Sequence, residues 1–250
     1  MNYSRYNSGL LFIPDVLFQC PQIISLNLEE NYISEISDEI GLLTRLEELI
    51  IYDNLISDIP DTICATKLKY LDISNNVFRE LRPSLFNVYT LIYIDVSYND
   101  LTEIPDVISN LLNLKKLDIS NNNISGIPDN ITNLPCLEFL DLSNNKLVAL
   151  PDGIITKLTN LKEIYLLSNN FGELPIEFIT NKNIVLIGLD FSSYSIINNY
   201  YYGKHFAIFE DGVFDDIIYC PNLIQALLPT PHKKNIKTWY SCSVLYLNQT

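Results

Sequence analysis

The sequence predicts a solenoid, in which small units of nearly equal length stack one after another. A short phrase recurs along most of the chain, for example L-D-I-S-N-N-N-I-S-G-I-P at 117–128 and L-D-L-S-N-N-K-L-V-A-L-P at 140–151. One asparagine of this phrase returns at steps of 23, 22, 23, 23, 23 and 24 residues, at Asn31, Asn54, Asn76, Asn99, Asn122, Asn145 and Asn169. A fixed period of this size is typical of stacked supersecondary units.

Each unit is expected to begin with a short strand. Its segment reads L-x-x-L-x-L-x-x-N-x-L, and the seven good copies begin at Ile23, Leu46, Leu68, Leu91, Leu114, Leu137 and Leu161. In the copy at 114–124, Leu117 and Ile119 alternate with Asp118 and Ser120, which is the period of a strand with one buried face. One such unit cannot bury its apolar face alone, so neighbouring units must stack on it.

The pattern weakens at both ends of the chain. An eighth copy begins at Ile184 and has Ser192 in place of the asparagine, and a partial copy at 8–14 precedes the first full unit. A weak ninth strand is expected at 223–228.

The recurring asparagine is expected to be structural. Its side chain carries two N–H donors and one carbonyl acceptor, so it can bond backbone groups in its own turn and in the adjacent turn. The seven asparagines would then form a ladder along the stack.

The second half of each unit reads I-P-D-x-I and is expected to turn back. Its prolines fall in one register at Pro60, Pro105, Pro128, Pro151 and Pro175. Proline fixes φ and lacks an N–H, which suits a segment that leaves the sheet. Ser37 and Arg82 replace the proline in two units, so those two turns are predicted to be less regular.

These motifs resemble the leucine-rich repeat family, strongly over 8–194 and weakly over 213–230. The resemblance implies an α/β horseshoe with a concave parallel sheet of about eight or nine strands, and with turns and short helices on the convex side. The 23-residue step with I-P-D-x-I most resembles the intracellular subclass that includes Scribble, erbin and the Ras-suppressor proteins. The extent of the repeat pattern divides the chain into two expected parts, a solenoid over 1–194 and an irregular region over 195–250.

The irregular region is expected to hold an insertion, a degenerate last repeat and a C-terminal cap. The stretch at 195–212 breaks the period and is rich in aromatic residues. We expect it to cover the open core of the last regular repeat. An alternative is that it leans over the concave face and takes part in binding.

Composition excludes several classes of function. The net charge of −14 disfavours binding to a phosphate backbone. No apolar run approaches the ~18–20 residues that span a membrane, and the N-terminal apolar run at 10–13 is too short for a signal peptide. Five scattered cysteines fit a reducing compartment. We therefore expect a cytoplasmic protein without a membrane span.

Catalytic and metal-binding motifs are absent from the sequence. It contains no H-E-x-x-H, no G-x-S-x-G and no phosphate-binding glycine-rich loop, and its two histidines have no ligand-type neighbours. The segment at 118–129 imitates a calcium loop, but it lacks the glycine and glutamate at the sixth and twelfth positions. We expect no cofactor and no enzymatic activity. The stacked Asp72, Asp95, Asp118 and Asp141 are assigned a structural role rather than a catalytic one.

The concave sheet is the expected binding surface. Its third strand position carries Tyr70, Tyr93, Lys116 and Phe139 in consecutive units, and Tyr98 and Tyr165 lie close by in the sequence pattern. Aromatic residues surrounded by charge are typical of an interaction hot spot. The alternative is that tyrosine and phenylalanine are present only because they suit strands. We predict that this patch binds a protein partner with a basic or mixed surface, and that the chain is a monomer.

The function that these observations favour is a non-catalytic scaffold or adaptor in signalling. The alternative is a recognition or regulatory subunit of a signalling or ubiquitin-ligase complex, which would need a separate catalytic chain.

Overall fold

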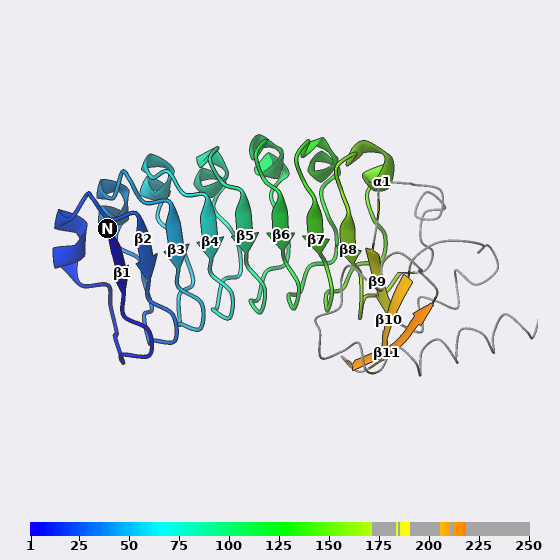
Figure 1. Cartoon of the computed structure of the whole chain (residues 1–250), viewed down its shortest axis with the longest axis horizontal. Helices are drawn as coiled ribbons and strands as arrows, with labels where there is room; N and C mark the ends of the chain where they lie inside the picture. The colour runs from blue at the N-terminus through cyan, green and yellow to red at the C-terminus, as the bar shows by residue number, and fades with distance from the viewer. Residues whose placement is uncertain (172–183, 185, 191–205, 211–212, 219–250) are drawn as a thin grey trace, which may run out of the picture.

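The computed structural model describes residues 1–171, 184, 186–190, 206–210 and 213–218. Within these residues, eleven strands form one sheet whose spatial order is the order of the sequence (Figure 1). The strands are β1 (Asn2–Ser4), β2 (Ser25–Asn27), β3 (Glu48–Ile50), β4 (Tyr70–Asp72), β5 (Tyr93–Asp95), β6 (Lys116–Asp118), β7 (Phe139–Asp141), β8 (Glu163–Tyr165), β9 (Leu186–Asp190), β10 (Phe206–Glu210) and β11 (Val213–Ile218). Every neighbouring pair is parallel except β10 and β11, which are antiparallel.

A second row of short helices runs along the stack beside the sheet (Figure 1). Six of them are five-residue 3-10 helices: η1 (Asp15–Gln19), η2 (Asp38–Leu42), η3 (Asp61–Ala65), η4 (Pro83–Asn87), η5 (Asp106–Asn110) and η6 (Asp129–Asn133). The last helix in the described part of the chain is the α-helical turn α1 (Ile154–Lys157). The predicted α/β solenoid, with strands on one side and short helices and turns on the other, is therefore confirmed.

The eight strands β2–β9 are those that the repeat motif predicts. The strand β1 gives the partial first unit a strand of its own, and it pairs with β2 through three residues. The strand β10 lies inside the stretch that breaks the repeat period, yet it continues the parallel sheet beside β9. The expected ninth strand at 223–228 lies outside the described residues, and so does most of the expected cap at 195–212.

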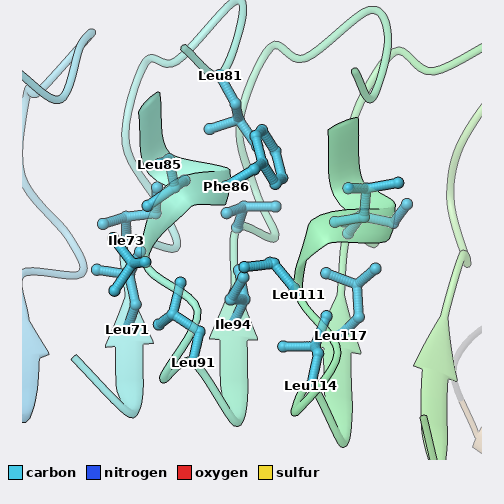
Figure 2. Close-up of a cluster of buried hydrophobic side chains, with 14 of the residues drawn as sticks. Leu71, Ile73, Leu81, Leu85, Phe86, Leu91, Ile94, Leu111, Leu114 and Leu117 are labelled. Atoms are coloured by element: carbon cyan, nitrogen blue, oxygen red, sulfur yellow. The ribbon is translucent and has the colours of Figure 1, made fainter. Parts of the chain in front are cut away.

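The core lies between the sheet and the row of helices. In the unit of β6, the side chains of Leu114, Ile119 and Ile124 have no solvent exposure, and Leu117 is 2% exposed. Figure 2 shows that the equivalent residues of neighbouring units lie next to one another, for example Ile94 between Leu71 and Leu117. Burying each such side chain contributes about 1.5–3 kcal/mol relative to exposure, and only a stack can provide it.

The prediction of irregular turns at Ser37 and Arg82 is wrong. Both residues precede ordinary 3-10 helices, and their backbone dihedrals are −61° and 147° for Ser37 and −64° and 141° for Arg82. Pro60 has nearly the same values, −68° and 152°. Proline is preorganised for this conformation, but other residues adopt it freely. At Ser37 the side-chain oxygen also accepts a hydrogen bond from the Glu39 N–H at 3.2 Å.

The irregular units are those in which the asparagine step departs from 23 residues. In the 24-residue step, the Leu158 N–H donates to the Ile154 carbonyl four residues earlier, whereas the equivalent Leu134 N–H donates to the Ile131 carbonyl three residues earlier, so one extra residue is held between these two positions. In the 22-residue step, Thr66 ends η3 in an extended conformation. The N–H of the next residue, Lys67, already donates to the carbonyl of Leu46, at the start of the preceding strand segment. One residue is therefore gained or lost within the turns, and the strands keep their register.

Gly41 allows η2 and η3 to approach closely. A Cβ atom added there would lie 2.8 Å from both the Cβ and the carbonyl oxygen of Thr62. We expect Gly41→Ala to lower the free energy of unfolding by about 1–3 kcal/mol, because backbone must move to make room. Urea titration of this variant beside Gly126→Ala checks the expectation, since a Cβ at Gly126 meets nothing within 4 Å. Equal midpoints for the two variants would contradict it.

Candidate partner-binding face

The strand register places two parallel rows of side chains on the face of the sheet that is turned away from the core. Tyr70, Tyr93, Lys116 and Phe139 are direct neighbours on β4–β7, and we call them the central row. Asp72, Asp95, Asp118 and Asp141 are direct neighbours two residues later on the same strands, and we call them the acidic row. The residues between the rows, such as Leu117, point into the core, so both rows lie on the opposite face.

Two aromatic pairs flank the lysine of the central row. The rings of Tyr70 and Tyr93 are stacked, with centroids 4.2 Å apart and an angle of 5° between their planes. The rings of Phe139 and Tyr165 are 5.5 Å apart and tilted by 44°. The Lys116 Nζ atom lies 5.7 Å from the centroid of Phe139. Five of the six predicted partner-binding residues are thus brought together on five consecutive strands, β4–β8.

Tyr98 is the sixth of these residues, and it lies in the turn after β5. Its side chain is 60% exposed and its φ is 52°, in the left-handed region. The equivalent residues of the next two units are Asn121 and Asn144, which tolerate this region better than tyrosine does. Within the described residues, Tyr98 makes no ring contact with the central row.

The acidic row shapes the turns that follow the strands. In each unit one carboxylate oxygen accepts the N–H of the serine two residues later, at 3.1 Å for Asp72, 2.9 Å for Asp95, 2.9 Å for Asp118 and 2.8 Å for Asp141. These bonds agree with the structural role expected from the sequence. Asn27 holds the same position on β2, and its amide oxygen accepts the Glu29 N–H at 3.1 Å. The turn therefore needs an oxygen acceptor and does not need a negative charge.

The charges of the acidic row are poorly compensated. Burial raises the pKa of Asp72, Asp118 and Asp141, and for Asp118 burial together with repulsion from Asp141 and Asp95 brings the pKa to about 7. Within the described residues, no lysine or arginine forms an ion pair with any member of the row. The ion pairs between described residues lie elsewhere, at Lys69–Glu47, Arg82–Asp58, Arg82–Asp61 and Glu138 with Lys115 and Lys162. The sequence pattern predicts that these carboxylates stack on adjacent strands. It does not predict the raised pKa values, because these depend on how deeply the folded chain buries each carboxylate.

The recurring asparagines lie under the turns beyond the strands. The Asn122 side chain is 8% exposed; its amide donates to the carbonyls of Val96, Ile119 and Ser120, and its oxygen accepts the Leu101 N–H. Val96 and Leu101 belong to the preceding unit, so the side chain joins two units. The same four kinds of bond recur at Asn54, Asn76, Asn99, Asn145 and Asn169.

Within the described part of the chain, no group of three or more histidine, cysteine, aspartate or glutamate side chains is arranged to hold a metal ion. No helix in the same part is long and apolar enough to cross a membrane. Cys20, Cys64 and Cys136 are free thiols.

Comparison with known proteins agrees with this geometry. The family model for the leucine-rich repeat matches residues 66–124 and 90–147. No curated protein matches the sequence.

Solved structures that cover 76% of the chain include a leucine-rich-repeat protein of Leptospira interrogans, with 26% identity and a TM-score of 0.62. They also include the plant peptide hormone receptor RGFR1 in complex with RGF2, with 28% identity and a TM-score of 0.63. A third is the ectodomain of the Arabidopsis thaliana membrane receptor kinase GASSHO1/SCHENGEN3 in complex with CASPARIAN STRIP INTEGRITY FACTOR 2, with 25% identity and a TM-score of 0.64. The aligned part spans 56%, 32% and 23% of those chains, respectively. Residues 66–147 are therefore similar to leucine-rich repeats, and the described repeats stack into a solenoid with the fold of these leucine-rich-repeat structures.

Proposed function

We propose that this chain is a protein-binding module whose partner lies on the face formed by the central row and the acidic row. The observation that carries the proposal is the stacked pair of Tyr70 and Tyr93, which lies on an open sheet beside carboxylates that form no ion pair among the described residues. Large aromatic surfaces amid polar groups are enriched among the residues that dominate binding energy. Two of the similar solved structures are receptors in complex with a ligand, which also supports a binding role for this fold.

We further propose that the module acts without catalysis, as a monomeric scaffold or adaptor in the cytoplasm. Three free cysteines, spread over three different units, support a reducing environment. The 23-residue repeat supports the intracellular subclass, although two of the similar structures are plant receptors, one of them described as an ectodomain. The seven asparagines are proposed to hold the binding face in shape rather than to touch the partner.

Replacing Tyr70, Tyr93, Lys116 and Phe139 together with alanine is expected to remove partner binding. The variant removes three of the four side chains that form the two aromatic pairs of the face, so the affinity should fall more than tenfold, or by over ~1.4 kcal/mol. The measurement is affinity capture with mass spectrometry from the native cell, using wild-type and variant protein with equal thermal stability.

A matched control carries Tyr89→Ala and Leu112→Ala. Both residues are exposed, at 58% and 56%, and both lie in turns that lead into strands rather than in either row. The control should capture the same proteins as wild type. A folded quadruple variant that captures them in unchanged amounts would overturn the proposal.

A further inference from the structure

The acidic row keeps negative charge where the fold needs only an oxygen acceptor. Asn27 provides that acceptor on β2 without a charge, and its bond to the turn is as short as the bond of Asp72. Four adjacent carboxylates at the ~4.8 Å spacing of strands repel one another. A feature that destabilises the free protein and is not required by its turn points to a role in binding.

The carboxylate oxygens that do not bond the turns have few hydrogen-bond partners among the described residues. Asp95 Oδ2 accepts the Tyr93 hydroxyl at 3.2 Å. The second oxygens of Asp72, Asp118 and Asp141 accept no hydrogen bond among the described residues. A cation from outside would therefore find acceptors that the chain itself leaves open.

Aromatic pairs lie on the same neighbouring strands as these carboxylates at two places. The first joins the Tyr70–Tyr93 stack to Asp72 and Asp95 on β4 and β5, and we call it the first subsite. The second joins the Phe139–Tyr165 pair to Asp141 on β7 and β8, and we call it the second subsite. An arginine guanidinium can stack on an aromatic ring and pair with a carboxylate at the same time, whereas a lysine ammonium cannot stack in this way.

Lys116 separates the two subsites. It lies on β6 between Tyr93 and Phe139, and its positive charge repels a third cation at the middle of the face. The strands from the centre of the first subsite to the centre of the second span three spacings, or about 14 Å. Four residues of an extended chain cover about the same length, and residues four apart point to the same side.

We infer that the partner is a basic polypeptide segment in extended conformation that carries two arginines four residues apart, one for each subsite. This inference rests on the proposed function and names the chemistry of the ligand at the same face. The net charge of −14 favours the approach of such a segment from a distance.

Binding of labelled peptides to the purified chain tests the inference. The probe is a fluorescein-labelled 13-residue peptide of glycine and serine with arginines at positions 5 and 9. Its comparison peptides carry lysines at the same positions, or arginines at the adjacent positions 6 and 7. Fluorescence anisotropy at ~150 mM salt should show the spaced arginine peptide binding about fivefold or more tighter than either comparison peptide.

The variant for this test is Asp72→Asn combined with Asp95→Asn. Asparagine keeps the turn bond, as Asn27 shows, so the variant should fold normally, and it loses both charges and the Tyr93 hydroxyl bond to Asp95 Oδ2. Its affinity for the spaced arginine peptide should fall about tenfold. The control is Asp106→Asn with Asp129→Asn, which changes the net charge by the same amount at exposed helix positions. The affinity of this control for the spaced arginine peptide should fall less than about twofold.

Equal binding of the arginine and lysine peptides would overturn the inference, and so would equal losses in the two double variants, because either result means attraction by net charge alone. The quadruple alanine variant separates this inference from the proposed function. If that variant loses its native partner while the peptides do not discriminate, the face binds proteins but the arginine chemistry is wrong. If that variant keeps its partner, the proposed function fails as well.

Discussion

Replacing Asn122 with alanine is expected to lower the free energy of unfolding by about 3 kcal/mol, although the substitution removes no apolar contact from the core. The side chain satisfies three carbonyls and one N–H in a region that is closed to water. Alanine leaves these groups without a partner, and a buried polar group without a partner costs more than a hydrogen bond gains.

The loss of stability should affect the whole stack and not only the unit that contains Asn122. The bonds of Asn122 join the unit of β6 to the unit of β5, and in a solenoid the stability depends on such contacts between neighbours. The measurement is a urea titration followed by circular dichroism, with the whole chain as the sample.

Asn123→Ala is the matched control, because it removes the same side chain one residue later. The backbone N–H of Asn123 bonds to Leu101, but its side chain makes no hydrogen bond among those that the structure describes. The control should change the free energy of unfolding by less than about 0.5 kcal/mol. Equal losses for the two variants would mean that the ladder of asparagine bonds does not stabilise the stack.

The repeat fixes most of the architecture because spacing and side-chain type act together. A leucine at the fourth position and another at the sixth must both face the core, so the strand containing Leu117 has one possible register against its neighbours. The central row and the acidic row follow from that register. Five of the six residues predicted for the partner-binding patch therefore meet in the structure, while Tyr98 lies in a turn whose conformation the pattern does not specify.

Features that depend on the backbone alone were not predictable in this way. The strands β1 and β10 pair with their neighbours through main-chain bonds, and neither carries the full leucine motif. The turn at Arg82 is regular although it lacks the repeat proline in register, because its dihedral angles suit most residues. The charge state of Asp118 also depends on its surroundings, since burial and two neighbouring carboxylates set it.

The solenoid is expected to be more stable near pH 5 than near pH 8, in contrast to proteins whose carboxylates are held by ion pairs. Burial raises the pKa of Asp118 from 3.8 to about 7 when the chain folds. Between these two values the folded state binds more protons than the unfolded state, so the free energy of unfolding falls as the pH rises. The stability that protonated Asp118 contributes is fully present below about pH 4 and is lost as the pH rises through about 7.

The size of the effect is about 2–4 kcal/mol between pH 5 and pH 8, because Asp72 and Asp141 shift in the same direction and share the repulsion. Asp118→Asn should therefore stabilise the chain at pH 8 by about 1–3 kcal/mol, since asparagine keeps the bond to the Ser120 N–H and removes the charge. At pH 5 the same substitution should change stability much less. Asp106→Asn serves as the control at an exposed position.

The measurement is the midpoint of thermal unfolding of the wild-type chain, Asp118→Asn and Asp106→Asn at pH 5 and at pH 8. A wild-type midpoint that rises toward pH 8, or an Asp118→Asn variant that is destabilised at pH 8, would mean that a cation already neutralises the acidic row in the free protein. A partner arginine would then have no open acceptors to pair with. The pH dependence of the free chain therefore also tests the physical basis of the inferred arginine subsites, because the repulsion that destabilises the face is the repulsion that a basic ligand would relieve.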